Sequence, residues 1–175
     1  MKKYDIIFSN LDGTLIKTIS GETFPKGIWD MQIRFEVLDK IKEVKPEYLL
    51  IVSNQGGIEK GFVSQSDFST KLDYICASIR EYCNITVDYY YCGTNNDNYY
   101  FKKPNIGMLE QAISDYDLMS DNNNHLPIYK KSEMLMIGNA SGKPSQFSDS
   151  DKKTAENFCI DYLDVEDFCK TNFND

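Results

Sequence analysis

The sequence predicts an α/β fold in which a doubly wound parallel sheet carries helices on both faces. Short apolar runs rich in β-branched and aromatic residues alternate with segments of helical periodicity along the chain. Polar side chains directly follow several of these apolar runs. In parallel sheets, ligands bind beyond the carboxyl ends of the strands. The sequence therefore predicts one sheet with a ligand site at one edge.

The first part of the chain contains two expected strands and one expected helix. Residues 4–9 form the first apolar run and residues 48–52 the second. Glycine and proline between them indicate a loop over residues 16–30. A helix should follow this loop and end before Pro46, because apolar residues recur there at helical spacing: Phe35, Leu38, Ile41 and Val44.

A second helix is expected to begin after Ser64, which precedes Asp67 with the spacing of a capping box. Its apolar face would comprise Phe68, Leu72, Ile75, Ile79 and Tyr82. The alternation then continues as strand 86–92, helix 106–116, surface loop 118–130, strand 133–137, helix 152–158, strand 159–163 and helix 165–171. We find no internal repeat, and we expect residues 1–175 to form a single domain.

Composition narrows the classes of function. The net charge of −8 argues against a protein that coats nucleic acid through bulk electrostatics, although a local basic rim could still grip one strand end. No apolar run approaches the ~18 residues that a membrane span requires. The five cysteines form no Cys-x-x-Cys pair, and the single histidine, His125, lies in a polar run. We therefore expect no zinc site and an intracellular protein, cytoplasmic or nuclear and not secreted, with reduced and mostly buried cysteines.

Polar residues at four predicted strand ends should converge on one crevice. Asn10 and Asp12 follow the first strand, and Ser53 follows the second. Lys103 lies in the loop after the third strand, and Asn139 follows the fourth. Because the carboxyl ends of parallel strands share one edge of the sheet, these side chains should lie close together.

The segment Asn10-Leu11-Asp12-Gly13-Thr14 resembles the first motif of the haloacid-dehalogenase-like (HAD) phosphatases, and the other three strand ends resemble the later motifs in order. The chain is similar in particular to polynucleotide kinase 3′-phosphatases, over nearly its whole length. The similar segments are residues 15–25, 53–58, 103–108, 137–144 and 148–157. The resemblance implies a Rossmann-like HAD fold with a minimal cap and no kinase domain.

The resemblance also implies roles for individual residues. The side chain at position 10 would attack phosphorus, and Asp12 would be the general acid and base. Ser53 would donate to a phosphate oxygen, and Lys103 would neutralise phosphoryl charge. Mg²⁺ would be bound by the side chain at position 10, the carbonyl of Asp12 and the side chain of Asn139.

Two of these positions depart from the family pattern, because Asn10 and Asn139 stand where the family has acids. An amide is a poor nucleophile, and each missing charge removes roughly 4 kcal/mol of attraction for the cation at ~4 Å and an effective dielectric of ~20. We therefore expect weak or absent Mg²⁺ binding. Asp149 or Asp151 could supply a compensating acid, but we favour the interpretation that Asp151 caps the helix at 152–158.

Further side chains could contact a substrate. The candidates in the four segments and their flanks are Asn54, Lys60, Lys102 and Lys143. Tyr99 and Tyr100 lie in the loop before Lys103 and are candidates for stacking on unpaired bases.

Three functions are compatible with these residues. The first is a polynucleotide 3′-phosphatase domain that acts on nucleic-acid 3′ ends, DNA before RNA, with activity lost or strongly impaired by Asn10 and Asn139. The second is a non-catalytic protein that binds a nucleic-acid end or a protein partner. The third, a phosphatase for sugar or histidinol phosphates, ranks last, because that group often carries a cysteine/histidine zinc loop and residues 92–101 contain one cysteine and no histidine.

Overall fold

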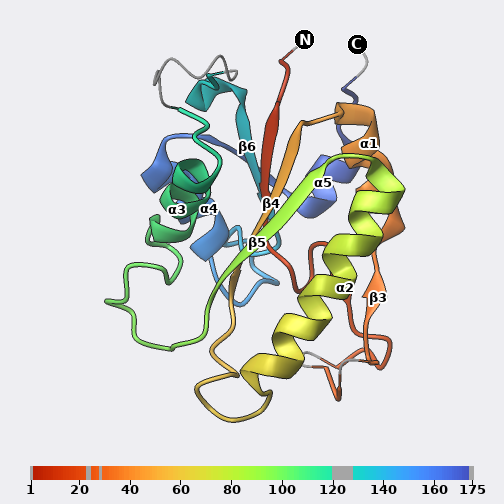
Figure 1. Ribbon diagram of the computed structural model, residues 1–175, viewed down its shortest axis with the longest axis vertical. Coiled ribbons are helices and arrows are strands. Elements are labelled where there is room, and N and C mark those ends of the chain that lie inside the picture. Colours follow the sequence, from red (N-terminus) through yellow and green to blue (C-terminus); the bar gives the residue numbers. More distant parts are fainter. Residues whose placement is uncertain (1, 23–24, 28, 120–127, 174–175) are drawn as a thin grey trace.

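A five-stranded parallel sheet forms the centre of the protein (Figure 1). The computed structural model describes residues 2–22, 25–27, 29–119 and 128–173. The strand order is β5 (Thr86–Cys92), β4 (Tyr48–Asn54), β1 (Ile6–Ser9), β6 (Met134–Gly138) and β7 (Asp161–Asp164), and each neighbouring pair is parallel. The predicted doubly wound α/β fold is confirmed.

Helices cover both faces of the sheet (Figure 1). On one face lie α1 (Phe35–Val44), α2 (Gln65–Cys83) and α5 (Val165–Lys170), and on the other lie α3 (Gly107–Asp115) and α4 (Ser150–Phe158). Alternate strand residues point to opposite faces. In β1, Ile7 therefore belongs to the first core cluster, whereas Ile6 and Phe8 belong to the second.

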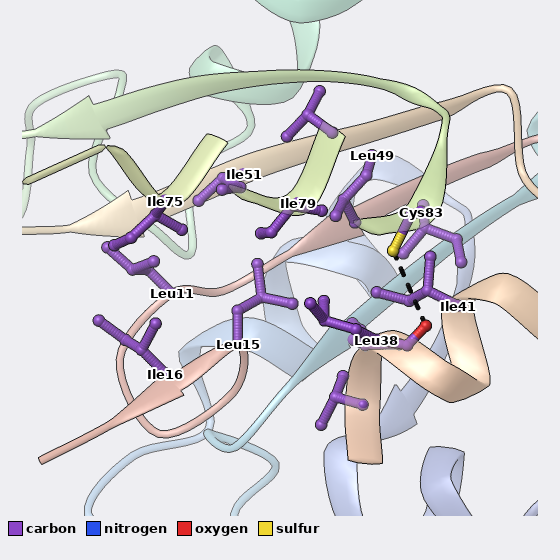
Figure 2. Packing of buried hydrophobic residues seen from close by; sticks show 14 of the residues in the cluster. Leu11, Leu15, Ile16, Leu38, Ile41, Leu49, Ile51, Ile75, Ile79 and Cys83 are labelled. Carbon is purple, nitrogen blue, oxygen red and sulfur yellow. Dashed lines mark hydrogen bonds between the residues drawn. The ribbon is translucent and has the colours of Figure 1, made fainter. Parts of the chain in front are cut away.

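The larger core cluster fills the space between the sheet and the first layer of helices (Figure 2). Ile75 and Ile79 of α2 pack with Leu38 and Ile41 of α1 against strand residues such as Leu49, and each of these five side chains is fully buried. Burying one such side chain contributes roughly 1.5–3 kcal/mol. Leu11, Leu15 and Ile16, which follow β1 directly, extend the same cluster (Figure 2). The core therefore anchors the loop that carries the first polar motif.

Cysteines contribute to packing. Cys76, Cys83 and Cys92 are buried and unpaired, and burial raises the pKa of the Cys83 thiol to about 11. The Cys83 Sγ lies 3.8 Å from the carbonyl oxygen of Leu38, to which it donates (Figure 2).

Among the described residues, no helix combines the length and hydropathy needed to cross a bilayer.

The prediction of a loop over residues 16–30 is partly wrong. It begins with β2 (Ile16–Lys17), which pairs antiparallel with β3 (Gln32–Ile33) as a small second sheet. Strands of two residues are too short to produce a recognisable alternation. Asp30 anchors the connection between them: its carboxylate accepts hydrogen bonds from Ser20 Oγ (2.6 Å) and the Lys26 N–H (2.9 Å).

The helix starts and faces are close to expectation. Ser64 accepts a hydrogen bond from the Asp67 N–H at 3.0 Å, as its capping spacing predicted. The predicted face of α1 is wrong at its start, since Phe35 is 50% exposed and Val37 is buried instead.

A short 3₁₀ turn, η1 (Lys131–Glu133), leads into β6. Most of the loop expected over residues 118–130, including His125, lies outside the described residues.

Candidate functional site

The four predicted strand ends meet at the carboxyl edge of the sheet. β1 is the central strand, and β4 and β6 lie on either side of it. Asn10 directly follows β1, Ser53 lies near the end of β4, and Lys103 lies in the loop after β5. Asn10 is 9% exposed, Ser53 2% and Lys103 3%. Asn139, which is partly buried, directly follows β6, so that four segments distant in sequence form one polar centre.

The Asn10 amide is the hub of this centre. Its Nδ2 donates to the backbone carbonyl of Asp12 (2.8 Å) and to Oδ1 of Asn139 (2.9 Å), with a longer contact to Thr14 Oγ1 (3.4 Å). Its Oδ1 accepts from Nζ of Lys103 at 3.0 Å. Asn10 and Asn139 are therefore hydrogen-bonded to each other.

Asn139 approaches the backbone of the first motif very closely. Gly13 has φ +76°, and a Cβ placed on it would lie 2.2 Å from Asn139 Nδ2. Only glycine accommodates both this conformation and this contact. Arg34 adds support from the other side, because its Nη1 donates to the Gly13 carbonyl at 3.0 Å.

Lys103 is a buried cation whose three N–H donors are all used. Its Nζ donates to Asn10 Oδ1 (3.0 Å), the Val52 carbonyl (2.9 Å) and Asp151 Oδ1 (2.6 Å). Asn54, predicted as a substrate contact, instead holds the Lys103 backbone: its Nδ2 donates to the Lys103 carbonyl at 3.0 Å, and its Oδ1 accepts the Lys103 N–H at 2.9 Å. Backbone and side chain of Lys103 are both fixed.

The expectation that Asp151 caps the last-but-one helix is wrong. Helix α4 begins at Ser150, the N-cap residue is Asp149, and Asp151 lies inside the first turn. The Asp151 side chain is 1% exposed, pairs with Lys103 and accepts the Ala140 N–H at 3.0 Å. A buried ammonium needs a counter-charge, and Asp151 provides it. Asp149 pairs instead with Lys153 at the surface, at 2.7 Å.

Asp12 lies at the mouth of the site. Its side chain is 44% exposed, and its Oδ1 is 3.5 Å from Nζ of Lys71, a lysine of α2 whose own side chain is only 6% exposed. Nε2 of Gln55 donates both to Asp12 Oδ2 (2.6 Å) and to Ser53 Oγ (2.8 Å). Since the Ser53 hydroxyl accepts from Gln55, its hydrogen can be donated to a ligand.

Sequence reasoning missed Lys71, Gln55 and Thr14 as members of the site. Lys71 had a signal: it lies three residues after Phe68 and four before Ile75, on the buried stripe of α2. A lysine on an apolar stripe needs an anionic partner, which here is Asp12. Gln55 and Thr14 had none beyond their place in the motifs.

The three lysines predicted as a basic rim differ in availability. Lys60 is exposed. Lys102 Nζ lies 2.6 Å from Asp97 Oδ1, and Lys143 Nζ lies 2.8 Å from Asp167 Oδ2. The hydrogen bond with Asp167 is the main cause that raises the pKa of Lys143. The rim is thus largely neutralised by neighbouring acids.

Tyr99 and Tyr100 are 46% and 52% exposed. Each packs against Phe101, with ring centroids 5.9 and 6.0 Å apart. Both rings therefore keep a face or an edge available to solvent next to the loop that carries Lys103.

Comparison with known proteins identifies the family of this chain. A sequence profile described as polynucleotide kinase 3 phosphatase matches residues 5–169, which include all four strand ends. The chain belongs to this family of HAD phosphatases. Family membership does not by itself assign roles to Asn10 and Asn139.

The proteins similar to the chain include a viral protein, a yeast enzyme and a bacterial phosphatase of known structure. An uncharacterized 20.8 kDa protein of Autographa californica nuclear polyhedrosis virus is 25% identical over 99% of this chain and 90% of its own length. The bifunctional polynucleotide phosphatase/kinase of Schizosaccharomyces pombe is 30% identical over 95% of this chain, which spans 38% of that protein. A D,D-heptose 1,7-bisphosphate phosphatase from B. bronchiseptica, crystallised with magnesium and phosphate, superposes with a TM-score of 0.64 over 90% of this chain and 78% of its own, at 14% identity.

The side chains of this site do not fit Mg²⁺. The cation prefers carboxylate oxygens and gives up its water reluctantly. Among the described residues, no group of three or more His, Cys, Asp or Glu side chains could hold a metal. The Asp12 carbonyl and Asn139 Oδ1 already accept the Asn10 amide hydrogens, and Asp151 is paired with Lys103.

Proposed function

We propose that this member of the family binds the terminal phosphate of a nucleic-acid 3′ end and does not hydrolyse it through position 10. One observation carries the proposal: position 10 bears an amide whose oxygen accepts a hydrogen bond from Lys103 at 3.0 Å. Nucleophilic catalysis by a carboxylate needs an anionic oxygen, and an amide has none. Other polar groups nevertheless surround Asn10 in this site.

Groups that can recognise a phosphate surround Asn10. Lys71 is the more available cation, since its ion pair with Asp12 is long (3.5 Å) and that carboxylate is 44% exposed. Incoming phosphate oxygens could replace part of this interaction. The Ser53 hydroxyl can donate to a second phosphate oxygen. The positive charge of Lys103, whose Nζ lies 3.0 Å from Asn10 Oδ1, would attract the phosphate from the far side of Asn10.

Nucleic acid is favoured as the carrier of the phosphate by the family and by the phosphatase/kinase relative of S. pombe. The net charge of −8 and the paired lysines of the rim argue for recognition of an end and against coating of a long polyanion. Tyr99 and Tyr100 could stack on the last bases. Single-stranded DNA is the ligand that we would test first.

Binding and hydrolysis can be measured on one oligonucleotide. Fluorescence anisotropy should show a Kd for a 3′-phosphorylated single strand about tenfold or more below that of the 3′-hydroxyl strand, with a 5′-phosphorylated strand as the control for charge alone. Equal affinity for all three strands would contradict the proposal. So would phosphate release with Mg²⁺ at an ordinary enzymatic rate, ~1–10³ s⁻¹. Adding a sugar phosphate as competitor tests the third function. If the sugar phosphate displaces the labelled strand at a lower concentration than the unlabelled 3′-phosphorylated strand does, a small-molecule ligand is favoured.

A further inference from the structure

The Asn10 side chain is held in one orientation by two neighbours of opposite hydrogen-bonding character. Lys103 Nζ, at 3.0 Å, can only donate, so the atom facing it must be the amide oxygen. The Asp12 carbonyl, at 2.8 Å, can only accept, so the atom facing it must be the amide nitrogen. Both contacts require the same orientation. Turning the amide over would set donor against donor and acceptor against acceptor.

In this orientation the amide nitrogen lies between the oxygens that could otherwise bind a cation. Nδ2 is 2.8 Å from the Asp12 carbonyl oxygen and 2.9 Å from Asn139 Oδ1. Its two hydrogens therefore satisfy both oxygens. Mg²⁺ would need these oxygens at 2.0–2.1 Å from itself and would have to displace both hydrogen bonds.

The charges around the amide also balance without a cation. Two of the neighbouring side chains are lysines, Lys71 and Lys103, and each faces one carboxylate, Asp12 and Asp151 respectively. The sum of these four charges is zero. No excess negative charge remains to compensate Mg²⁺ for the water that it would lose.

We propose that the hydrogen-bonded amides of Asn10 and Asn139 take the place of a divalent cation, so that the pocket is assembled and binds phosphate without a metal. For its consequence in phosphate binding this inference rests on the proposed function, whereas the assembly of the pocket does not. The NH₂ group of Asn10, which donates one hydrogen to each of two oxygens, performs the structural task of the ion. It does not supply the ion's Lewis acidity, in keeping with a pocket that binds without hydrolysing.

The first test compares the protein with Asn10→Asp/Asn139→Asp by thermal unfolding in EDTA and in excess MgCl₂. In EDTA the double variant should melt below the unsubstituted protein, because acceptor oxygens would face one another. Mg²⁺ should raise its Tm by about 5–10 °C at ~100-fold above Kd. The unsubstituted protein should show no shift. Its matched control is Gln65→Glu/Asn98→Asp, which adds the same two charges at exposed positions and should not respond to Mg²⁺.

Two results would overturn the proposal: an equal Mg²⁺ shift in the unsubstituted protein, or no shift in the double variant. If the double variant does not fold, Asn10→Asp alone provides the measurement, because it replaces the amide nitrogen that faces the Asp12 carbonyl and Asn139 Oδ1, and absence of any Mg²⁺ shift in it counts against the proposal. The second test repeats the anisotropy titration of the 3′-phosphorylated strand with EDTA and with Mg²⁺. The Kd should agree within about twofold. Binding only with Mg²⁺ overturns metal independence, whereas no binding in either buffer refutes the proposed function and leaves the unfolding result to decide on the amide bridge.

Discussion

The buried ion pair between Lys103 and Asp151 offers the sharpest test of how the site is held together. The two side chains are 2% and 1% exposed, and Nζ lies 2.6 Å from Oδ1. Asp151→Asn keeps the shape of the side chain but removes its charge. Lys103 would then be a buried ammonium with only neutral partners, because the new amide has a single oxygen for two donors, Lys103 Nζ and the Ala140 N–H.

Removing one member of a buried pair typically costs about 3–5 kcal/mol, because the other charge is left uncompensated. For a chain of 175 residues, 1 kcal/mol corresponds to roughly 2–4 °C in Tm. Asp151→Asn should therefore lower Tm by about 6–20 °C. Lys103→Met should cost a similar amount, since it leaves the Asp151 carboxylate with the Ala140 N–H as its remaining donor.

Urea unfolding of the two single variants and of Lys103→Met/Asp151→Asn gives the interaction energy directly. The double variant removes both charges, so it should be more stable than the sum of the single effects implies, by about 1–3 kcal/mol. The matched control is the surface pair of Lys153 and Asp149, at 2.7 Å with side chains 55% and 45% exposed. Its cycle, with Lys153→Met and Asp149→Asn, should give less than about 1 kcal/mol.

Additive effects of the two buried substitutions would refute this reasoning. The reasoning would also be refuted if each single substitution lowered the free energy of unfolding by less than about 1 kcal/mol, because leaving a desolvated charge unpaired should lower it by more. Equal interaction energies in the buried and surface cycles would show that burial does not decide the strength of the pair.

Two further predictions concern the rest of the site and its surroundings. Lys71→Met should raise the Kd for a 3′-phosphorylated strand about 10–100-fold in the anisotropy assay, as expected for loss of one charged hydrogen bond, while Lys170→Met, an exposed control in the last turn of α5, should change it by less than about threefold; equal effects would remove Lys71 from the site. Hydrogen bonds from Ser20, together with the Lys26 N–H, hold the pKa of Asp30 at about 2, below the ordinary 3.8. A lowered folded-state pKa stabilises the fold above pH ~4, and this stabilisation is lost as pH falls toward 2. Asp30→Asn should therefore be the less stable protein at neutral pH and should lose less stability than the unsubstituted chain between those pH values in urea unfolding; parallel pH profiles would contradict the assignment.

The fold and the location of the site could be predicted from sequence because both depend on local patterns. Apolar runs and helical spacing identify buried strands and covering helices over a few residues each. Strands joined by helical crossovers are parallel, so their carboxyl ends share an edge. The residues next to each strand end in the sequence were therefore sufficient to assign four side chains to one site: Asn10, Ser53, Lys103 and Asn139.

The hydrogen-bond and ion-pair partners within the site could not be predicted, because they depend on how segments far apart in the chain pack against each other. Asp151 looked like a helix cap, since an aspartate near a helix start usually is one, and only the packing of α4 beside Lys103 makes it a counter-ion. Lys71 was missed although it lies on the buried stripe of α2, because its partner Asp12 lies 59 positions earlier in the chain.

The sequence by itself determined that positions 10 and 139 carry amides at the end of parallel strands, and hence that these two positions contribute no negative charge to the site. Only the tertiary structure decided what those amides do. It brings two residues 129 positions apart to 2.9 Å and places a donor-only lysine and an acceptor-only carbonyl on opposite sides of Asn10. The direction of a hydrogen bond depends on which atoms face each other in space, and no local pattern in a sequence contains that information.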